Sequence, residues 1–190
     1  MVSQKTKARL EVRQAALGDV DGIVALVRRA YEDMPVYSPG EVRGQINNYP
    51  EGCFIAVLDD RIVGYCASMR VPESLAFKDH SWREITGGGY GSRHDPKGEW
   101  LYGYEMCVDP QARGTRIGRR LYEERRALAE RLELSGIVFG GGMPNLARSK
   151  RKVSDADEYL EQVASGKLHD PVIRFQPANG FEAVRVLENY

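Results

Sequence analysis

The chain has 190 residues, enough for one well-packed domain and few for two of full size. Lysine plus arginine and aspartate plus glutamate each number 27, so the formal net charge is zero and no overall field favours nucleic acid or an anionic membrane. No apolar run is long enough to span a membrane, and the polar first ten residues lack the core of a signal peptide. We therefore expect a cytoplasmic protein, with residues 1–8 as a disordered tail and residues 9–190 as a single domain.

The cysteines lie singly in apolar, strand-like runs at Cys53, Cys66 and Cys107. None belongs to a CxxC pair, and none has a histidine nearby in the sequence. This pattern indicates small buried side chains, and it predicts neither a metal site nor a disulfide.

The first third of the chain alternates strand and helix patterns. Residues 10–15 alternate apolar and polar side chains as a half-buried strand does, and residues 20–31 carry an apolar stripe at helical spacing that Pro35 closes. Ser38-Pro39 followed by Glu41 is typical of a helix start and predicts a second helix that ends near Asn48.

Two β-rich runs follow, residues 53–58 and 61–71, joined by the turn residues Asp59-Asp60, so this segment predicts a hairpin. Residues 72–98 are rich in glycine and irregular, and long loops of this kind are usually functional. We expect a flap over an acceptor site there, with His80 and His94 as candidate bases by their chemistry alone.

The centre of the sequence reads as strand, glycine loop and helix. Residues 101–108 are apolar and aromatic, Asp109-Pro110 ends the strand, and an amphipathic helix starts near Ile117. This order directs unpaired backbone N–H groups, at the positive end of a helix dipole, towards one spot, which favours phosphate binding.

The amino-acid sequence of that loop resembles the acyl-CoA site of the GNAT superfamily of N-acetyltransferases. The family pattern is Val-x-Pro-x-x-Arg-Gly-x-Gly-Ile-Gly followed by x-x-Leu. The matching positions are Val108, Pro110, Arg113, Gly114, Ile117, Gly118 and Leu121. Arg116 differs from the family pattern, because the family normally has Gly or Ala at this position. The loop must therefore either avoid a positive φ or accommodate a long cation beside a pyrophosphate.

The resemblance implies an α/β (α+β) fold, the GNAT fold, in which a mixed, mostly antiparallel central sheet has helices on both faces and a splayed strand pair holds CoA. It also implies acetyl-CoA as a substrate, no metal, and a primary amine as the acceptor. The cofactor-binding residues that it implies are Met106, Cys107, Val108, Arg113, Gly114, Thr115, Arg116, Ile117 and Gly118. The N–H of Val108 or Cys107 is expected to stabilise the developing oxyanion.

The catalytic residues that we predict are Glu105 and Tyr104. Glu105 is the carboxylate of the strand before the loop, one residue off the parity of the positions from which the family often supplies its base. A bulge in this strand would turn it inward as a general base; a paired structural acid is the alternative. Many family members carry a tyrosine that protonates the departing thiolate, but the matching position here is Gln176, which cannot act as an acid. Water or another tyrosine must then supply that proton, or the thiolate is protonated outside the enzyme.

Beyond the central helix, residues 136–140 predict a strand that splays from residues 101–108, and residues 155–164 predict a helix. Asp170-Pro171 predicts a short helix that Gly180 ends, and residues 183–187 predict a last strand. A cluster of cations between the first two elements, Arg148, Lys150, Arg151 and Lys152, is usually a solvated face.

The resemblance extends to the acetyltransferase module found in front of a nitrilase-like carbon–nitrogen hydrolase. The chain is then either an excised domain or a free-standing relative, so a fused hydrolase domain in a longer parent chain and a homodimer both stay open. The main alternative function is a non-catalytic acyl-CoA-binding regulatory module. Nucleic-acid binding is weaker, because glutamates interleave with the arginines of the central helix, among them Arg119, Arg120, Arg125 and Arg126.

Overall fold

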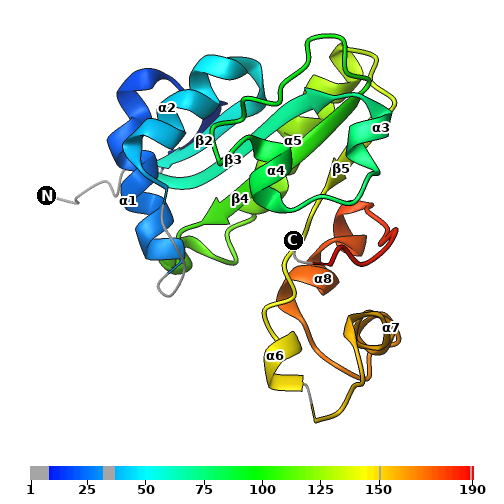
Figure 1. The fold of residues 1–190 in the computed structure, drawn as a ribbon. Helices are drawn as coiled ribbons and strands as arrows, with labels where there is room; N and C mark the ends of the chain where they lie inside the picture. Colours follow the sequence, from blue (N-terminus) through cyan, green and yellow to red (C-terminus); the bar gives the residue numbers. More distant parts are fainter. Residues whose placement is uncertain (1–8, 32–36, 150, 189) are drawn as a thin grey trace, which may run out of the picture. The chain divides into compact units, whose positions relative to one another are not determined.

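The structure is a computed structural model that describes residues 9–31, 37–149, 151–188 and 190. The chain divides into two compact units. The first unit contains the residues up to Lys78 together with Trp82–Phe139, and the second contains Asp79–Ser81 with Gly140–Tyr190 (Figure 1). The predicted tail at residues 1–8 lies outside the described residues. The prediction of one domain over residues 9–190 stays a prediction.

A five-stranded sheet forms the centre of the first unit (Figure 1). The strands follow one another in sequence order, and every neighbouring pair is antiparallel except β4 and β5, which are parallel. Their bounds are β1 Leu10–Gln14, β2 Cys53–Leu58, β3 Arg61–Val71, β4 Trp100–Val108 and β5 Gly136–Phe139. The predicted mixed, mostly antiparallel sheet is confirmed.

Helices cover both faces of this sheet. The longer ones are α1 Val20–Ala30, α2 Pro39–Asn48 and α5 Ile117–Arg131, and the short ones are α3 Glu73–Ala76 and α4 Trp82–Thr86. Adjacent residues of β3 show the two faces: a Cβ on Gly64 would meet Ile117 of α5 at 2.7 Å, whereas the Tyr65 hydroxyl donates to Gln45 of α2 at 2.7 Å. Successive side chains of a strand point to opposite faces, so α2 and α5 lie on opposite sides.

The predicted start and turn signals are present in the structure. Ser38 and Glu41 form a reciprocal capping box at the start of α2. Asp59 and Asp60 have φ values of 47° and 61°, which match the two left-handed residues of a type I′ hairpin turn. Single 3₁₀ turns, Leu17–Asp19, Pro50–Gly52 and Pro110–Ala112, link the longer elements. These local signals explain why the predicted and observed bounds of the first strands and helices nearly coincide.

The segment from residue 72 to 98 is more structured than the sequence indicated, because it contains α3 and α4. Its glycine stretch is bonded to α2: Gln45 Nε2 donates to Gly89 O at 2.8 Å, and Asn48 Nδ2 donates to Tyr90 O at 3.0 Å. Apart from these two short helices the segment is irregular, as the sequence indicated, and its role as a flap stays a prediction. Contacts with a helix distant in the sequence supply the hydrogen bonds that local patterns could not reveal.

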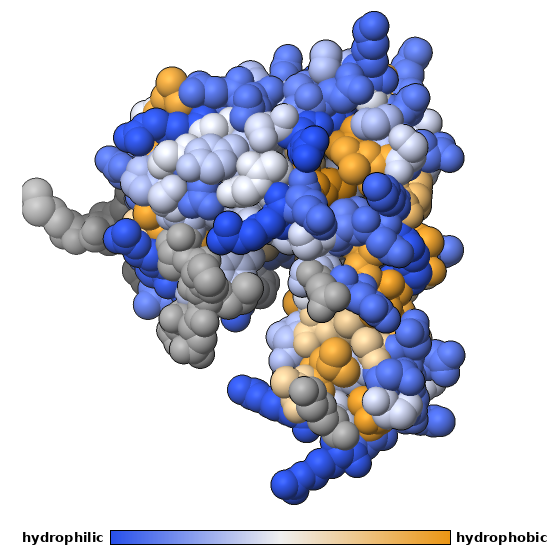
Figure 2. Space-filling view, viewed as in Figure 1, coloured by the Kyte–Doolittle hydropathy of each residue, from blue (hydrophilic) through white to orange (hydrophobic). Residues whose placement is uncertain are grey.

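The second unit is helical, with α6 Leu146–Ser149, α7 Ala156–Ala164, α8 Pro171–Phe175 and the 3₁₀ turn Pro177–Asn179. Its core consists of Val153, Tyr159 and Val163, against which Met143, Leu146, Leu168 and Ile173 pack. The carboxylate of Asp170, which is fully buried, accepts from the Tyr159 hydroxyl at 2.7 Å and from two N–H groups at the start of α8. Figure 2 shows apolar side chains reaching the surface of this unit among charged ones.

The predicted helix ending at Gly180 is confirmed, since Gly180 has a left-handed φ of 75°. The predicted last strand at residues 183–187 is wrong. These residues form no strand with any described residue, and Val184 is 71% exposed. A β-rich pattern becomes a strand only where a ladder partner satisfies its backbone, and the pattern alone does not provide that partner.

Candidate active site

The strands β4 and β5 separate halfway along β4. Their ladder runs from the pair Trp100 and Gly136 to the pair Gly103 and Phe139, and the described β4 continues to Val108 with pairing to β3 alone. Residues 104–108 therefore present an unpaired edge on the side of β5. This is the splayed strand pair that the sequence predicts.

The backbone direction along this edge follows from one hydrogen bond at its end. Asp109 N donates to Val63 O at 2.8 Å, so by the alternation of an antiparallel ladder the N–H of Cys107 also points to β3. The N–H groups of Met106 and Val108 point to the open edge. Of the two alternative oxyanion donors, the N–H of Val108 points to the open edge, whereas that of Cys107 points to β3; the role itself stays a prediction.

A bulge lies where the edge opens, as expected from the sequence. Ala67 of β3 pairs with Glu105, whereas Ser68 pairs with Gly103, so Tyr104 is the extra residue on β4. The bulge turns both Tyr104 and Glu105 towards the face of α2. The hydroxyl of Tyr104 reaches the Gly91 segment beside α2, and Glu105 contacts the residues that flank α1 and α2.

Glu105 is buried between two tyrosines. The Tyr31 hydroxyl donates to its Oε1 at 2.8 Å, and the Tyr37 hydroxyl donates to its Oε2 at 2.5 Å. Burial raises the pKa of Glu105 above the ordinary carboxyl value, and the two tyrosine bonds only partly offset this. The Tyr31 hydroxyl also lies 3.3 Å from Met106 O, on the open edge of β4, so one hydroxyl links the carboxylate to that edge.

The loop after β4 leaves its amides available. Within the described residues, no protein group accepts from the N–H groups of residues 114–118, and the Thr115 hydroxyl turns back to Ala112 O at 2.5 Å. Gly114 has a φ of 82°, with nothing within 4 Å of the place a Cβ would take. Arg116 also adopts a left-handed φ of 65°. The loop therefore does not avoid a positive φ at the position where the family pattern has a small residue.

Asp109 fixes the start of this loop. Its carboxylate is 1% exposed, and it accepts from Arg29 Nε at 2.8 Å, lies 3.6 Å from Arg61, and accepts from Gln111 N at 3.0 Å. Burial alone would raise the pKa of Asp109, but the Gln111 N–H and the two guanidinium groups outweigh it and hold that pKa below the usual value. The aspartate therefore stays ionised and anchors the loop.

The other candidates, His94, His80 and Cys107, make contacts that are typical of structural residues. His94 accepts from Arg70 N at 3.2 Å and stacks on Tyr49 at 4.2 Å, and burial lowers its pKa. His80 belongs to the second unit, where it is buried against Tyr190. The thiol of Cys107 is buried, and burial raises its pKa well above the usual value, which disfavours the reactive thiolate.

Sequence reasoning missed Arg125. It was grouped with the exposed arginines of the central helix, but in the structure it is 1% exposed and lies under β4. The signal was present, because position 125 falls between Leu121 and Leu128 on the apolar stripe of α5.

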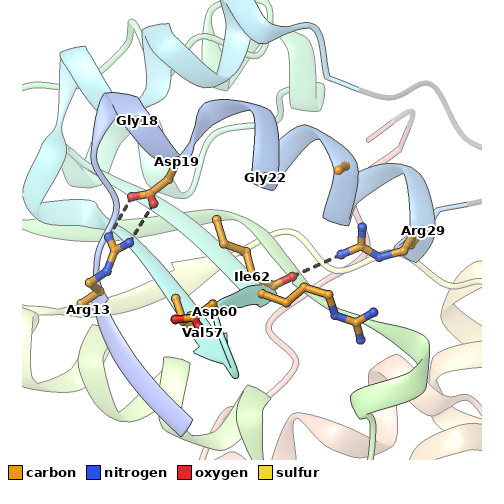
Figure 3. Close-up of a pocket in the computed structure, with 10 residues that line it drawn as sticks. Arg13, Gly18, Asp19, Gly22, Arg29, Val57, Asp60 and Ile62 are labelled. Atoms are coloured by element: carbon orange, nitrogen blue, oxygen red, sulfur yellow. Dashed lines mark hydrogen bonds and ion pairs between the residues drawn. The ribbon is translucent and has the colours of Figure 1, made fainter. Parts of the chain in front are cut away.

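A separate cavity of about 300 Å³ lies beside α1 and the β2–β3 hairpin (Figure 3). Arg13 and Asp19 line it and form a bidentate ion pair (Figure 3). Arg29 and Arg61 also line the cavity. None of the predicted site residues lines this cavity. Its lining includes Arg29 and Arg61, which are the partners of Asp109, and no residue of the open edge of β4.

A five-stranded sheet with a splayed parallel pair, followed by a loop of free amides at a helix start, defines the fold of CoA-dependent acyltransferases. The sequence profile of the acetyltransferase (GNAT) family matches residues 23–148. The chain belongs to this family. Among the described residues there is no His, Cys, Asp and Glu cluster suited to a metal ion, and no helix long and apolar enough to cross a membrane.

Similar proteins cover most of this chain. "Probable hydrolase YhcX" of Bacillus subtilis (strain 168) is 35% identical over 182 residues, which are 96% of this chain and 35% of that protein. The chain thus spans about a third of the length of that relative. "Uncharacterized N-acetyltransferase YkwB" of the same strain is 28% identical over 185 residues, 95% of this chain and 81% of that protein. Among solved structures, "GphF GNAT-like decarboxylase in complex with isobutyryl-CoA" is 25% identical with a TM-score of 0.73, covering 88% of this chain and 84% of that one.

Proposed function

We propose that this chain transfers the acetyl group of acetyl-CoA to a primary amine, which attacks the thioester directly. The observation that carries the proposal is Glu105, a buried carboxylate that a bulge turns inward beside the open edge of β4. A protonated amine cannot attack a thioester, so a base at this place is the group that the reaction needs.

The residues around the splay fit CoA. The free amides of Gly114, Thr115, Arg116, Ile117 and Gly118, with the Arg113 side chain, form a cradle for a pyrophosphate at the start of α5. The open-edge backbone groups of Met106 and Val108, on either side of Cys107, suit an amide-bearing pantetheine arm, which adds to a sheet edge as a strand does. Acetyl-CoA supplies the activated acyl group.

The chain's own groups account for the protons. Glu105 removes the proton from the attacking amine as the new C–N bond forms, and the N–H of Val108 stabilises the charge on the thioester oxygen. As the C–S bond breaks, Tyr31 passes its hydroxyl proton to the sulfur and receives the proton held by Glu105. Burial and the Glu105 charge raise the pKa of Tyr31, so it acts without ionising. The side chain of Tyr104 lies on the same face of the sheet as Glu105.

The test couples turnover to binding. Thiol release is measured with acetyl-CoA and a panel of small amines, aminoglycosides, lysine and peptides, and calorimetry measures binding of CoA. We expect binding, and release of thiol with at least one amine. Binding without turnover across the panel would contradict the transferase proposal and favour the alternative, a regulatory module that senses acyl-CoA. Absence of binding would contradict both.

A second candidate is decarboxylation of an acyl-CoA that carries a carboxylate β to the thioester. The similarity to a GNAT-like decarboxylase supports it, as does the raised pKa of Glu105, which suits a proton donor. The C–C bond would break, CO₂ would leave, and the carbon that keeps the electron pair would take a proton from Glu105. Malonyl-CoA is the probe: mass spectrometry would show acetyl-CoA without any amine present, and unchanged malonyl-CoA would exclude this candidate.

We also infer that the chain is of the module type fused to nitrilase-like hydrolases, which its identity to a protein named as a probable hydrolase supports. On this view the acyltransferase chemistry belongs to the chain and amide hydrolysis does not. Assays for ammonia release from amides and nitriles are expected to be negative with this chain, and a positive result would contradict the assignment.

Three free, buried cysteines support the inference of a reducing, cytoplasmic location.

A further inference from the structure

Arg125 is an unusual residue of the first unit, because its charged side chain is buried under the sheet without a carboxylate in contact. It is 1% exposed, and no ion pair links it to an acidic side chain among the described residues. Burying a guanidinium is costly unless its N–H groups are satisfied. A cation retained at such a place needs a reason beyond packing.

Arg125 lies 5.7 Å from the centroid of the Tyr122 ring, and its hydrogen-bond acceptors are a serine hydroxyl and two backbone carbonyls at the bulge. Its Nε donates to Ser68 Oγ at 2.8 Å, and one terminal nitrogen donates both to Ala67 O at 2.7 Å and, closer still, to Glu105 O. Ala67 and Glu105 are the pair next to the extra residue, Tyr104. The guanidinium therefore supplies donors at the place where the extra residue disturbs the regular ladder.

Space for this contact exists because position 103 is a glycine. A Cβ on Gly103 would lie 3.0 Å from Arg125 Cζ, so a side chain there would displace the guanidinium by a few tenths of an ångström. Arg125 reaches β4 from α5, whereas the carboxylate of Glu105 lies on the opposite face with Tyr31 and Tyr37. The two residues thus meet through the backbone of Glu105 and not through its side chain.

We propose that Arg125 is a positioning residue that holds the β4 bulge and so keeps Glu105 turned into the active site. Without the bulge, a one-residue slip would turn Glu105 to the face of α5. The inference rests on the proposed role of Glu105 as the base.

The titratable groups around Glu105 show why the charge of Arg125 matters. They come from α1 and the segment before α2, from β3 and β4, and from α5; they are Tyr31, Tyr37, Tyr65, Cys66, Tyr104, Cys107 and Arg125. The tyrosines and cysteines are neutral while protonated, and burial raises their pKa values. Arg125 is the cation of this set, so its removal should make Glu105 harder to ionise.

The test compares Arg125→Met and Gly103→Ala with Arg126→Met as a neighbouring control. For each variant we measure the pH profile of kcat and the KM for acetyl-CoA, and titrate the Glu105 carboxyl by ¹³C NMR. We expect Arg125→Met to move the ascending limb and the Glu105 titration to higher pH by about one unit. At neutral pH kcat should fall about tenfold or more, with KM changed less than twofold. Gly103→Ala should move the ascending limb and the Glu105 titration in the same direction by a smaller amount. Arg126→Met should move neither of them.

Two results would overturn the proposal. The first is an unmoved Glu105 titration in Arg125→Met; the second is a loss of kcat in proportion to the unfolded fraction, with an unmoved profile. If Arg125→Met does not fold, Gly103→Ala decides by the same measures. Failure of the underlying function is distinguishable, because the wild-type chain would then show no turnover while the NMR titration would still report whether Arg125 sets the pKa of Glu105.

Discussion

Two carboxylates four residues apart, Glu105 and Asp109, are both buried at the open end of β4, yet their surroundings differ. Tyrosine hydroxyls surround Glu105, whereas two arginines and a backbone N–H surround Asp109. The pKa is raised at Glu105 and lowered at Asp109. Burial acts on both, so the partners decide the outcome.

The difference separates a group that can exchange a proton from one that cannot. A carboxylate with a raised pKa is a stronger base than an ordinary one, and its protonated form is easier to reach, which suits acid–base chemistry. A carboxylate held by two guanidinium groups keeps its charge and fixes the backbone that follows. We therefore propose that Glu105 takes part in the chemistry and that Asp109 anchors the loop.

The sharpest way to break this comparison is Glu105→Gln. Loss of a general base lowers kcat by roughly 10²–10⁴-fold, and we expect a loss in that range by thiol release, with CoA binding unchanged by calorimetry. Stability at neutral pH should not fall, because the glutamine removes a buried carboxylate that favours its protonated form. The control is Glu123→Gln on the exposed face of α5. Full activity of Glu105→Gln across pH would remove Glu105 from the mechanism.

Asp109→Asn should act on stability. It leaves Arg29 and Arg61 without their counter-ion, and since both arginines are partly exposed we expect a loss of about 2 kcal/mol, below that of a fully buried pair. The pKa of Asp109 is lowered in the folded state, so its contribution is present above the unfolded value and lost as pH falls through the folded one. Urea unfolding at neutral pH should show the deficit, which should shrink at about pH 3.

The exposed turn residue Asp60 provides the control for this experiment, because asparagine tolerates its left-handed φ of 61°. Asp60→Asn should leave stability within about 0.5 kcal/mol of the wild type. Equal losses in the two variants would show that the hairpin, and not the Asp109 carboxylate, anchors this region.

The contrast between these carboxylates was only partly predictable from the sequence. The strand, the glycine loop and the helix start follow from local patterns, as do the capping box at Ser38 and the turn at Asp59-Asp60. The bulge that turns Glu105 inward was one of two possibilities, because parity along a strand does not reveal an extra residue. Burial of Arg125 could have been inferred from the apolar stripe of α5, but its partners on β3 and β4 could not.

The two tyrosines bonded to Glu105 allow the proton path to be divided. Tyr37→Phe removes a bond that favours the carboxylate, so the pKa of Glu105 and the ascending limb of kcat should move to higher pH with a similar plateau. Tyr31→Phe should shift the limb in the same direction and also lower the plateau about tenfold, because Tyr31 alone of the pair contacts Met106 O on the open edge. Equal plateaus in the two variants would remove Tyr31 from the protonation of the thiolate.

The smallest effect concerns the loop that Asp109 anchors. Arg116 adopts a left-handed conformation that costs a side-chain-bearing residue about 1–2 kcal/mol, whereas glycine adopts it freely. After the entropy that glycine adds to the unfolded chain, Arg116→Gly should stabilise the protein by about 0.5–1 kcal/mol, and Gly114→Ala, at a φ of 82°, should destabilise it by about 1 kcal/mol. Thermal unfolding without CoA measures both, with shifts of about 2–4 °C per kcal/mol for a chain of this size. If Arg116→Gly weakens CoA binding while it stabilises the free protein, the strained arginine contributes to phosphate binding; if it only stabilises, the strain has no part in binding.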